Sequence, residues 1–369
     1  MNSSLFLADC AQIAADAVKA GRMDRRTFLK ACAFAGASPA LFAGLGLAAD
    51  KPAQIVHANW GGDAVTCTES IYGKAFTEAT GVKVVVDGTG PLEGKIREQV
   101  DAGNVTWDTC DADFFYNLRL GPEGKLEKID YSIVDKSKIL APYTHEYGVL
   151  GYWYSYVITW DSEKVKAEPS WADFFDVEKI PGKRTLFKWM NGALEGALLA
   201  DGVAADKLYP LDVDRALAKI ESIKDHLVFW DSGAASQQMF TSGEVVMGNI
   251  WQTRAGLLEK DTKGRVKWTW KLGNAAPASW VIPKGNPAGA EWANKWIAHM
   301  QDPNLQIEVM KCFGQGPANP AAADLMTPEQ RRLHPAAPEN LEQQVLLDSA
   351  YFAEKYDDVL NAYLDAISA

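Results

Sequence analysis

Four tryptophans stand at the ends of apolar, strand-like segments of the chain. Trp60 closes the segment QIVHANW, and Trp189, Trp230 and Trp251 end three later segments of the same kind. Ligands of open parallel sheets bind beyond the carboxyl ends of the strands, so two such units facing each other would bring the four rings into one cleft. A tryptophan face attracts a cation, which suits an amine-containing ligand. The alternative for each ring is an ordinary place in the core.

Charged and hydroxyl side chains occupy similar positions. Asp113 and Asp231 follow predicted strands and could pair with an ammonium group, whereas Arg254 could hold a carboxylate or phosphonate through two parallel hydrogen bonds. Thr89, in the turn after a predicted strand, and Ser232 complete the candidate ligand contacts. An amine partner together with an arginine describes the site of an ω-amino acid or a similar zwitterion. The alternatives are structural: Asp231 as a helix N-cap, Asp113 as a loop cap and Arg254 as a solvated residue of a first helical turn.

Motifs of catalysis or of cofactor binding do not accompany these residues. The sequence has no GxSxG nucleophile segment, no GxGxxG dinucleotide segment and no CxxC or HExxH metal spacing, and it holds five histidines in 369 residues. We therefore expect a binding protein without a cofactor or metal, and not an enzyme. An exported enzyme is the competing hypothesis, and an assay of turnover against binding would separate the two.

The elements that position these residues alternate between strands and helices. The first group is a strand at 54–60, a helix from Thr66 or Thr68 to Ala79, a strand at 82–87, a helix at 92–102 and a strand at 107–112. Strands separated by single helices imply a parallel sheet with right-handed crossovers.

A long aromatic and β-branched run, 148–160, leads to a second group of the same kind. Its strands are expected at 184–189, 226–230 and 245–251, with helices at 193–199, 233–240 and 254–259. Strands at 266–271 and 279–283 would carry the chain back toward the first group. Helices at 290–300, 303–312 and 341–367 complete the chain. The expectation is a two-domain α/β protein with a strand hinge, one lobe from 53–158 and 276–330, the other from 159–275 and 331–369.

Several segments resemble, in order, those of periplasmic solute-binding proteins of the spermidine/putrescine type. The segments are Asn59-Trp60, KAFTEATGVKV at 74–84, the stretch from Asp108 to GKLEKID at 124–130, SWADFF at 170–175, GEVVMGNIW at 243–251 and SWVIP at 279–283. The resemblance implies the type II periplasmic-binding-protein fold, a ligand site between two lobes, and delivery to a membrane permease driven by an ATPase. Because the chain has no GxxxxGKS or GxxxxGKT segment, that ATPase would be a separate polypeptide.

The resemblance carries some ligand contacts over and leaves others out. Trp60 and Trp251 match aromatic ligand-contacting positions, and Asp113 and Phe115 match a ligand-contacting serine and tyrosine. The acids that would hold a polyamine are missing, because the chain has KWMNG at 188–192 and an alanine just before the return strand. A buried ammonium without a partner is costly, so we expect a smaller amine such as an ω-amino acid. Putrescine or spermidine is the alternative.

A ferric-iron-binding protein of the same broad fold is a more remote alternative. Such sites usually combine adjacent tyrosines with other oxygen ligands. This chain has no Tyr-Tyr pair, and Tyr152 and Tyr154 flank a tryptophan in the run that reads as a hinge. A colourless purified protein would reject the iron hypothesis.

Residues 1–49 are typical of a twin-arginine export signal. Arg25-Arg26 precedes a stretch rich in Ala and Gly, 31–48, that ends in small residues. Cleavage near residues 48–49 would start the mature protein near Asp50, in the periplasm. The alternative is a single membrane anchor, which a proline and several Gly and Ser residues in the stretch disfavour.

Charge and cysteine content limit the partners and the compartment. The formal net charge of −11 at pH 7 disfavours nucleic acid and anionic membranes as partners. We expect a monomer whose partners are a small-molecule ligand and the permease. Beyond the leader, Cys67, Cys110 and Cys312 remain. Cys67 and Cys110 could form a disulfide in an oxidising compartment, or all three could be buried thiols.

Overall fold

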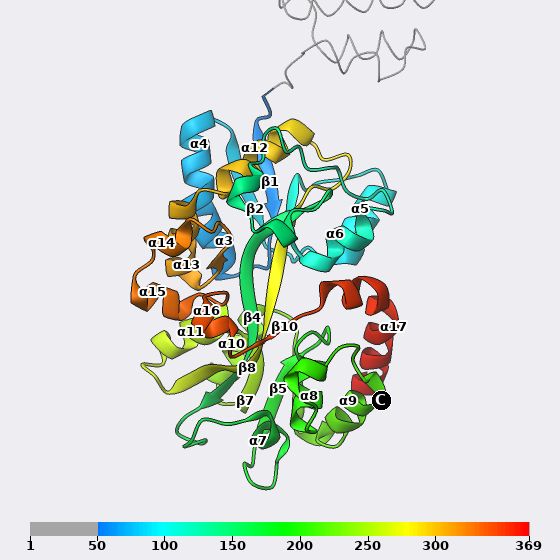
Figure 1. Ribbon diagram of the computed structural model, residues 1–369, viewed down its shortest axis with the longest axis vertical. Coiled ribbons are helices and arrows are strands. Elements are labelled where there is room, and N and C mark those ends of the chain that lie inside the picture. Colours follow the sequence, from blue (N-terminus) through cyan, green and yellow to red (C-terminus); the bar gives the residue numbers. More distant parts are fainter. Residues whose placement is uncertain (1–50, 369) are drawn as a thin grey trace, which may run out of the picture. The chain divides into compact units, whose positions relative to one another are not determined.

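The computed structural model describes residues 51–368 (Figure 1). The predicted export signal lies outside the described residues. Residues Ala53–Ala369 cluster into one compact unit. Between residues 51 and 368, no helix combines the length and the apolar character needed to cross a bilayer.

Ten strands of the described residues form one continuous sheet. They are β1 Gln54–Ala58, β2 Lys83–Asp87, β3 Thr109–Asp113, β4 Val149–Asp161, β5 Lys183–Phe187, β6 Leu227–Trp230, β7 Val245–Trp251, β8 Val266–Val281, β9 Gly316–Pro317 and β10 Val345–Leu346. Their order is β2-β1-β3-β8-β4-β7-β5-β6, with β9 attached to β4 and β10 to β8. Two groups of short strands are thus separated by two long strands.

Each group of short strands is parallel, as the alternation of strands and helices predicts. β1 pairs with β2 and β3, and β5 pairs with β6 and β7, all in parallel. We call the part around β1, β2 and β3 the first lobe and the part around β5, β6 and β7 the second lobe. The two-lobed α/β expectation is confirmed, and the residue boundaries given above for the lobes stay a prediction.

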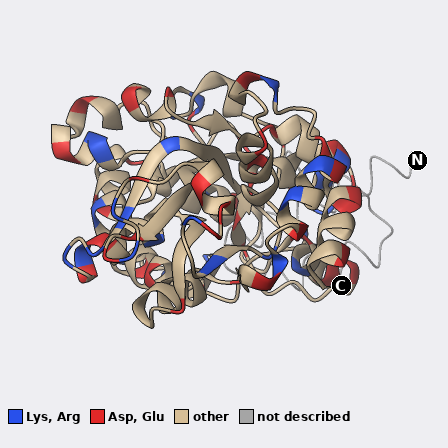
Figure 2. Cartoon of the chain, turned by 90° about the horizontal axis from the view of Figure 1, so that it is seen from below, with Lys and Arg blue, Asp and Glu red and all other residues tan. Residues whose placement is uncertain are grey.

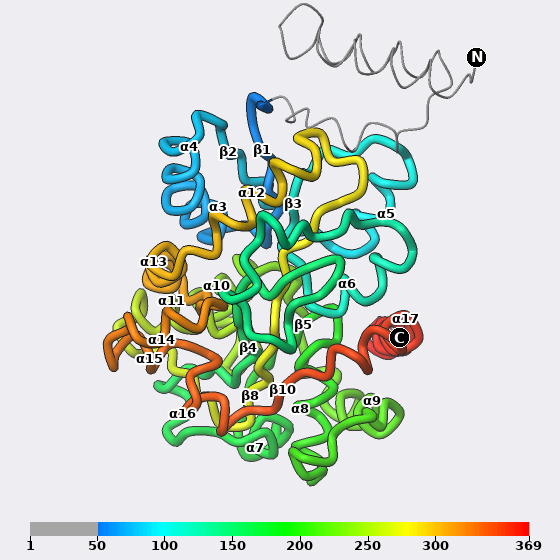
Figure 3. Tube along the Cα trace, turned by 45° about the horizontal axis from the view of Figure 1, so that its top comes forward, coloured from blue at the N-terminus to red at the C-terminus, as the bar shows by residue number. Residues whose placement is uncertain are grey.

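The long strands β4 and β8 connect the lobes. β4 pairs antiparallel with β8 and with β7, whereas β8 also pairs antiparallel with β3. Figures 1 and 3 show the two strands side by side between the lobes. The sequence predicted separate return strands, but the structure has one. The small residues and the proline at 272–278 suggest a break when read locally, yet the backbone of 274–278 pairs with β4, and β10 joins it.

Helices follow the strands in both lobes. The first lobe has α3 Asp63–Thr68, α4 Lys74–Thr80, α5 Glu93–Asp101 and α6 Phe114–Leu120, and the second has α7 Trp171–Phe175, α8 Ala193–Ala200, α9 Val213–Glu221, α10 Gly233–Thr241 and α11 Gln252–Asp261. The remaining helices are α12 Ala290–Met300, α13 Pro303–Phe313, α14 Ala322–Leu325, α15 Pro328–Leu333, α16 Pro338–Leu341 and α17 Ser349–Ser368. Figure 2 shows acidic and basic residues interspersed along the outer helices.

The first helix begins earlier than the sequence predicted. We expected a cap at Thr66 or Thr68, but α3 begins at Asp63. Gly62 precedes it with φ at 60°, a conformation that glycine adopts without strain, and so turns the chain directly into the helix. The loop between β1 and α3 is therefore short, and this keeps Asp63 close to Trp60.

A disulfide joins Cys67 in α3 to Cys312 in α13. Neither the Cys67–Cys110 pair nor three free thiols is therefore correct. α13 packs against α3, so two cysteines 245 residues apart in sequence have Cα atoms 6.0 Å apart. Cys110 is a buried free thiol in β3. Sequence spacing could not reveal this pairing, because it depends on how α13 returns to the first lobe.

Candidate ligand-binding site

A cavity lies where strands of both lobes end. The described residues that line it are Trp60, Ala64, Leu92, Asp113, Tyr116, Tyr152, Tyr154, Tyr156, Phe187, Trp189, Asn191, Trp251, Thr253, Arg254, Phe313, Gln315 and Tyr356. Trp60 and Trp189 follow the carboxyl ends of β1 and β5, and Asp113 and Trp251 are the last residues of β3 and β7. The cavity thus lies where parallel α/β sheets bind their ligands.

Three of the four predicted tryptophans line the cavity, and they come from both lobes. Trp60 of the first lobe and Trp251 of the second have ring centroids 6.1 Å apart. Trp189 packs against Phe187, whose centroid lies 5.4 Å away. Trp230 lies behind this wall: it is fully buried, stacks on Phe187 at 4.2 Å and meets Trp251 edge-on at 4.8 Å. It therefore supports the aromatic wall without lining the cavity.

Three tyrosines of β4 form a further aromatic wall that the sequence analysis missed. Tyr152, Tyr154 and Tyr156 are alternate residues of one strand, so they share one face of it. The pairing of β4 with β8 shifts register between Leu150 and Tyr152 and again between Tyr156 and Ile158. Such irregularities bend a strand and redirect side chains. The alternation of tyrosines is the signal for this wall in the sequence, although the same aromatic and β-branched run is also typical of a hinge strand.

Asp113 is an acid held in apolar surroundings. The hydroxyl of Tyr154 donates a hydrogen bond to its carboxylate. Burial raises the pKa of Asp113 to about 6, against the lowering effect of the Tyr154 hydrogen bond, and the charge of Glu93 raises it further. A carboxylate in this setting gains from an ammonium partner, because that partner replaces the water it has lost.

Arg254 lies at the cavity wall with its terminal nitrogens turned toward the first lobe. Nη1 lies 3.1 Å from the carboxylate of Asp63, and Nη2 donates to the carbonyl oxygen of Gly61 at 2.9 Å. Its side chain is only 2% exposed, and burial lowers its pKa while Asp63 opposes that shift. We expected a solvated residue or a ligand contact at this position. The structure excludes the solvated residue.

An outer chamber adjoins the cavity and gathers the other predicted contacts. Thr89, Lys95, Asp231 and Ser232 line it, together with glycines and with aromatic residues that it shares with the cavity. Asp231 is exposed and does not cap the following helix, because the Ser232 hydroxyl accepts the hydrogen bond of Ala235 N at 3.3 Å instead. Apart from Trp230, the predicted residues at strand ends thus gather in two adjoining regions.

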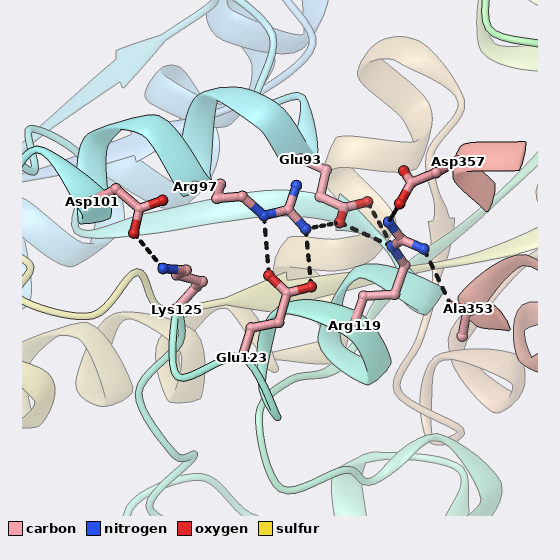
Figure 4. A network of polar contacts seen from close by, with 8 residues as sticks. All are labelled: Glu93, Arg97, Asp101, Arg119, Glu123, Lys125, Ala353 and Asp357. Atoms are coloured by element: carbon pink, nitrogen blue, oxygen red, sulfur yellow. Dashed lines mark hydrogen bonds and ion pairs between the residues drawn. The ribbon is translucent and has the colours of Figure 1, made fainter. Parts of the chain in front are cut away.

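Phe115 does not line the cavity, but its neighbour on α17 does. Phe115 packs on Tyr356, with ring centroids 4.9 Å apart, and Tyr356 lines the cavity. Arg119 fixes α17 beside α6: its guanidinium bonds to Glu93 at 2.9 Å, to Asp357 at 2.7 Å and to the carbonyl of Ala353 (Figure 4). The contribution of Tyr356 could not be found from the sequence, because the contact between α6 and α17 joins distant segments, with Arg119 and Asp357 238 residues apart.

The charge and size of the cavity restrict its ligand. Its described lining includes one acid, Asp113, and one base, Arg254. The cavity volume is about 40 Å³, and that of the outer chamber is about 270 Å³. One water needs roughly 10–15 Å³ by this measure, so the inner cavity suits a small solute. Among residues 51–368, no three His, Cys, Asp or Glu side chains converge as a metal site.

The sequence family of bacterial extracellular solute-binding proteins matches residues 72–338. The chain belongs to this family. A γ-aminobutyric acid-binding protein of Pseudomonas aeruginosa is 32% identical over 86% of this solute-binding protein and 92% of its own length. The spermidine/putrescine-binding periplasmic protein of Escherichia coli is 24% identical over 71% of this chain and 78% of its own.

Solved structures superpose over most of this solute-binding protein. The γ-aminobutyrate receptor Atu4243 is 37% identical, with a TM-score of 0.77 over 85% of this chain and 97% of its own. AgtB of A. tumefaciens R10, in complex with agropinic acid, is 29% identical, with a TM-score of 0.81 over 86% and 99%. AttC of Agrobacterium tumefaciens C58, open and unliganded, is 27% identical, with a TM-score of 0.62 over 86% and 100%.

Family membership confirms three expectations from the sequence. The solute-binding protein has the type II periplasmic-binding-protein fold, and it is the binding component of an ABC importer and not an enzyme. Its partners are a small ligand and a membrane permease with its ATPase. At nearly equal identity, the chain superposes more closely on the AgtB complex than on open AttC.

Proposed function

We propose that this protein captures a small zwitterion, an ω-amino acid of the γ-aminobutyrate type, in the cleft between its lobes. The observation that carries this proposal is the pairing of one acid with one base in the lining of a small aromatic cavity. Asp113 comes from the first lobe and Arg254 from the second. A ligand with one ammonium and one carboxylate would engage both lobes at once.

The ammonium group would pair with Asp113 among aromatic faces. Trp60, Trp251 and the tyrosines of β4 surround the space beside this carboxylate. Each aromatic face contributes about 0.5–2 kcal/mol to a cation that has left water. A polyamine carries at least two ammonium groups, and the described lining supplies one acid. Charge therefore favours the zwitterion over putrescine and spermidine.

The carboxylate would lie near Arg254 and the start of α11. This helix of ten residues begins at Gln252, and its early residues Thr253 and Arg254 line the cavity. Helix amino termini attract anions through free backbone N–H groups and the helix dipole. The side-chain amide nitrogen of Asn191, also in the lining, is buried without a protein partner. These donors complement the positive charge of Arg254.

Two relatives support the same ligand class. The Pseudomonas aeruginosa relative and the Atu4243 receptor are both described as binding γ-aminobutyrate. The AgtB ligand, agropinic acid, is a larger molecule, and the small inner cavity of this protein favours the smaller solute. The outer chamber leaves room for part of a longer ligand.

Calorimetry with γ-aminobutyrate, aminoethylphosphonate, putrescine and spermidine tests the proposal. We expect γ-aminobutyrate to bind more tightly than either polyamine. Asp113→Asn should lower the affinity for γ-aminobutyrate about 100-fold, because breaking a buried charge pair costs about 2–5 kcal/mol. Asp231→Asn is the matched control, since this acid is exposed in the outer chamber, and we expect a change of about twofold or less. Tighter binding of a polyamine would overturn the proposal.

We also propose export to the periplasm by the twin-arginine route and action as a monomer. Arg25-Arg26 and the apolar stretch after it support export, and the family is extracellular. Cleavage near residues 48–49 would leave the whole sheet and both lobes in the mature protein. A native mass spectrum of the periplasmic fraction would give the mass of one mature chain.

A further inference from the structure

Asp63 is a charged residue that contacts the other lobe and does not line the cavity. It is the first residue of α3, directly after Gly61 and Gly62. Its carboxylate lies 3.1 Å from Arg254 Nη1, and the Gly61 carbonyl accepts from Arg254 Nη2 at 2.9 Å. The loop of the first lobe thus offers two acceptors to one guanidinium of the second lobe.

The guanidinium lies between glycines of both lobes. A Cβ atom on Gly233, at the start of α10, would lie 2.3 Å from Arg254 Nε, closer than atoms can approach. A Cβ atom on Gly62 would lie 3.4 Å from Nη1. Arg254 is therefore enclosed by backbone on either side, and side chains larger than hydrogen at Gly233 would displace it.

We propose that Asp63 and the Gly61 carbonyl form a closing latch with Arg254, through which Asp63 sets ligand affinity without touching the ligand. The bonds exist only while the loop of the first lobe meets α11, so opening of the cleft breaks them. When the cleft opens, Arg254 loses these two acceptors and is hydrated instead. The closed state is stabilised by the difference in free energy between the two sets of hydrogen bonds. The proposal rests on the proposed function only in requiring that the ligand bind in this cleft.

A latch and a ligand contact have different signatures. The apparent dissociation constant equals the intrinsic constant divided by the fraction of protein in the binding-competent state. A weakened latch lowers that fraction and therefore lowers the affinity for each ligand by the same factor. Substitution of a residue that touches the ligand instead changes the ratio of the affinities for different ligands. Asp63 is 52% exposed, so salt should also weaken the latch by screening it.

Asp63→Asn tests the latch while keeping the size of the side chain. We expect the apparent dissociation constant of γ-aminobutyrate to rise about tenfold, the size expected for one lost charge-assisted hydrogen bond. The affinity for aminoethylphosphonate should fall by the same factor, and both ligands should dissociate faster. Glu123→Gln is the control, because Glu123 bonds to Arg97 at 3.0 Å within the first lobe (Figure 4) and should leave both affinities unchanged.

Small-angle scattering of the unliganded protein gives a readout that needs no ligand. We expect Asp63→Asn to enlarge the radius of gyration relative to wild type and to Glu123→Gln, with all three proteins folded by circular dichroism. Unchanged affinity and unchanged scattering would overturn the latch. A changed ratio of the affinities for the two ligands would also overturn the latch, because it would make Asp63 a ligand contact. If neither compound bound wild type, the proposed ligand class would fail, and scattering would still decide the latch.

Discussion

At the scale of single residues, the surroundings of Asp113 determine what it can bind. Two acids lie at strand ends on this edge of the sheet, but Asp231 is exposed, whereas Asp113 is enclosed by tyrosines. Burial raises the pKa of Asp113 to about 6, so the free protein holds it partly protonated in mildly acidic solution. An ammonium ligand favours the ionised form. Ligand binding and release of a proton from Asp113 are therefore coupled.

The affinity for γ-aminobutyrate should depend on pH between 5 and 8. The carboxylate that binds the ammonium titrates in the free protein at about pH 6 and at lower pH in the complex. Affinity should be constant well above pH 6 and fall as pH drops through about 6, approaching about tenfold per pH unit. Calorimetry across this range checks the slope. Asp113→Asn should bind weakly with no slope of this origin, and a slope that survives in this variant would assign the titration to another group.

At the scale of elements, α3 is attached at two points beside the cavity. The disulfide joins it to α13, which also carries Phe313 of the cavity wall, and Asp63 joins it to α11. The first attachment is covalent and lies within one side of the cleft, whereas the second spans the lobes. The disulfide therefore holds α3 and α13 together whether the cleft is open or closed, whereas the ion pair forms only when the lobes close.

Removing the disulfide should destabilise the protein. Cys67→Ser/Cys312→Ser frees a loop closed over 245 residues, and loss of such a constraint costs about 2–5 kcal/mol of unfolding free energy. Urea unfolding with and without a reducing agent measures it. Reduction should destabilise wild type and leave the double variant unchanged. Thiol titration of the denatured, unreduced mature chain should detect Cys110 alone, and detection of three thiols would contradict the pairing.

At the scale of the whole molecule, two lobes joined by β4 and β8 enclose a site that neither lobe completes alone. Asp113 and Trp60 belong to the first lobe, and Trp251 and Arg254 to the second. A ligand that contacts both lobes favours their approach by the difference between its affinities for the closed and the open state.

Export should depend on the arginine pair. Replacing Arg25 and Arg26 with lysine should trap the precursor in the cytoplasm, because the twin-arginine route requires the pair. Fractionation followed by immunoblotting compares the two proteins, and Edman sequencing of the periplasmic wild type should begin near Asp50. Replacement of Lys19 and Arg22 with glutamine is the control and should leave export intact. Normal delivery of the double lysine variant would refute this route.

Local sequence determined the parallel strands, most helices and the tryptophans and Asp113 at strand ends. Hydrophobic periodicity and flanking glycines act over a few residues, so the strands at 82–87 and 245–251 could be predicted within one or two positions. The order of strands then implied one edge where Trp60, Trp189, Trp230, Trp251 and Asp113 would meet, and of these only Trp230 lies behind the cavity wall. Alternate tyrosines on β4 carry a local signal as well, because residues two apart on a strand share one face.

Tertiary structure alone decided the partners of these residues. The pairing of Cys67 with Cys312, the approach of Tyr356 and the contact of Arg254 with Asp63 join segments 191 to 245 residues apart. Local patterns contain no information on such distances, because the partner depends on how whole helices dock. The continuity of β8 has the same origin: its middle is a poor strand by propensity, and pairing with β4 and β10 holds it extended.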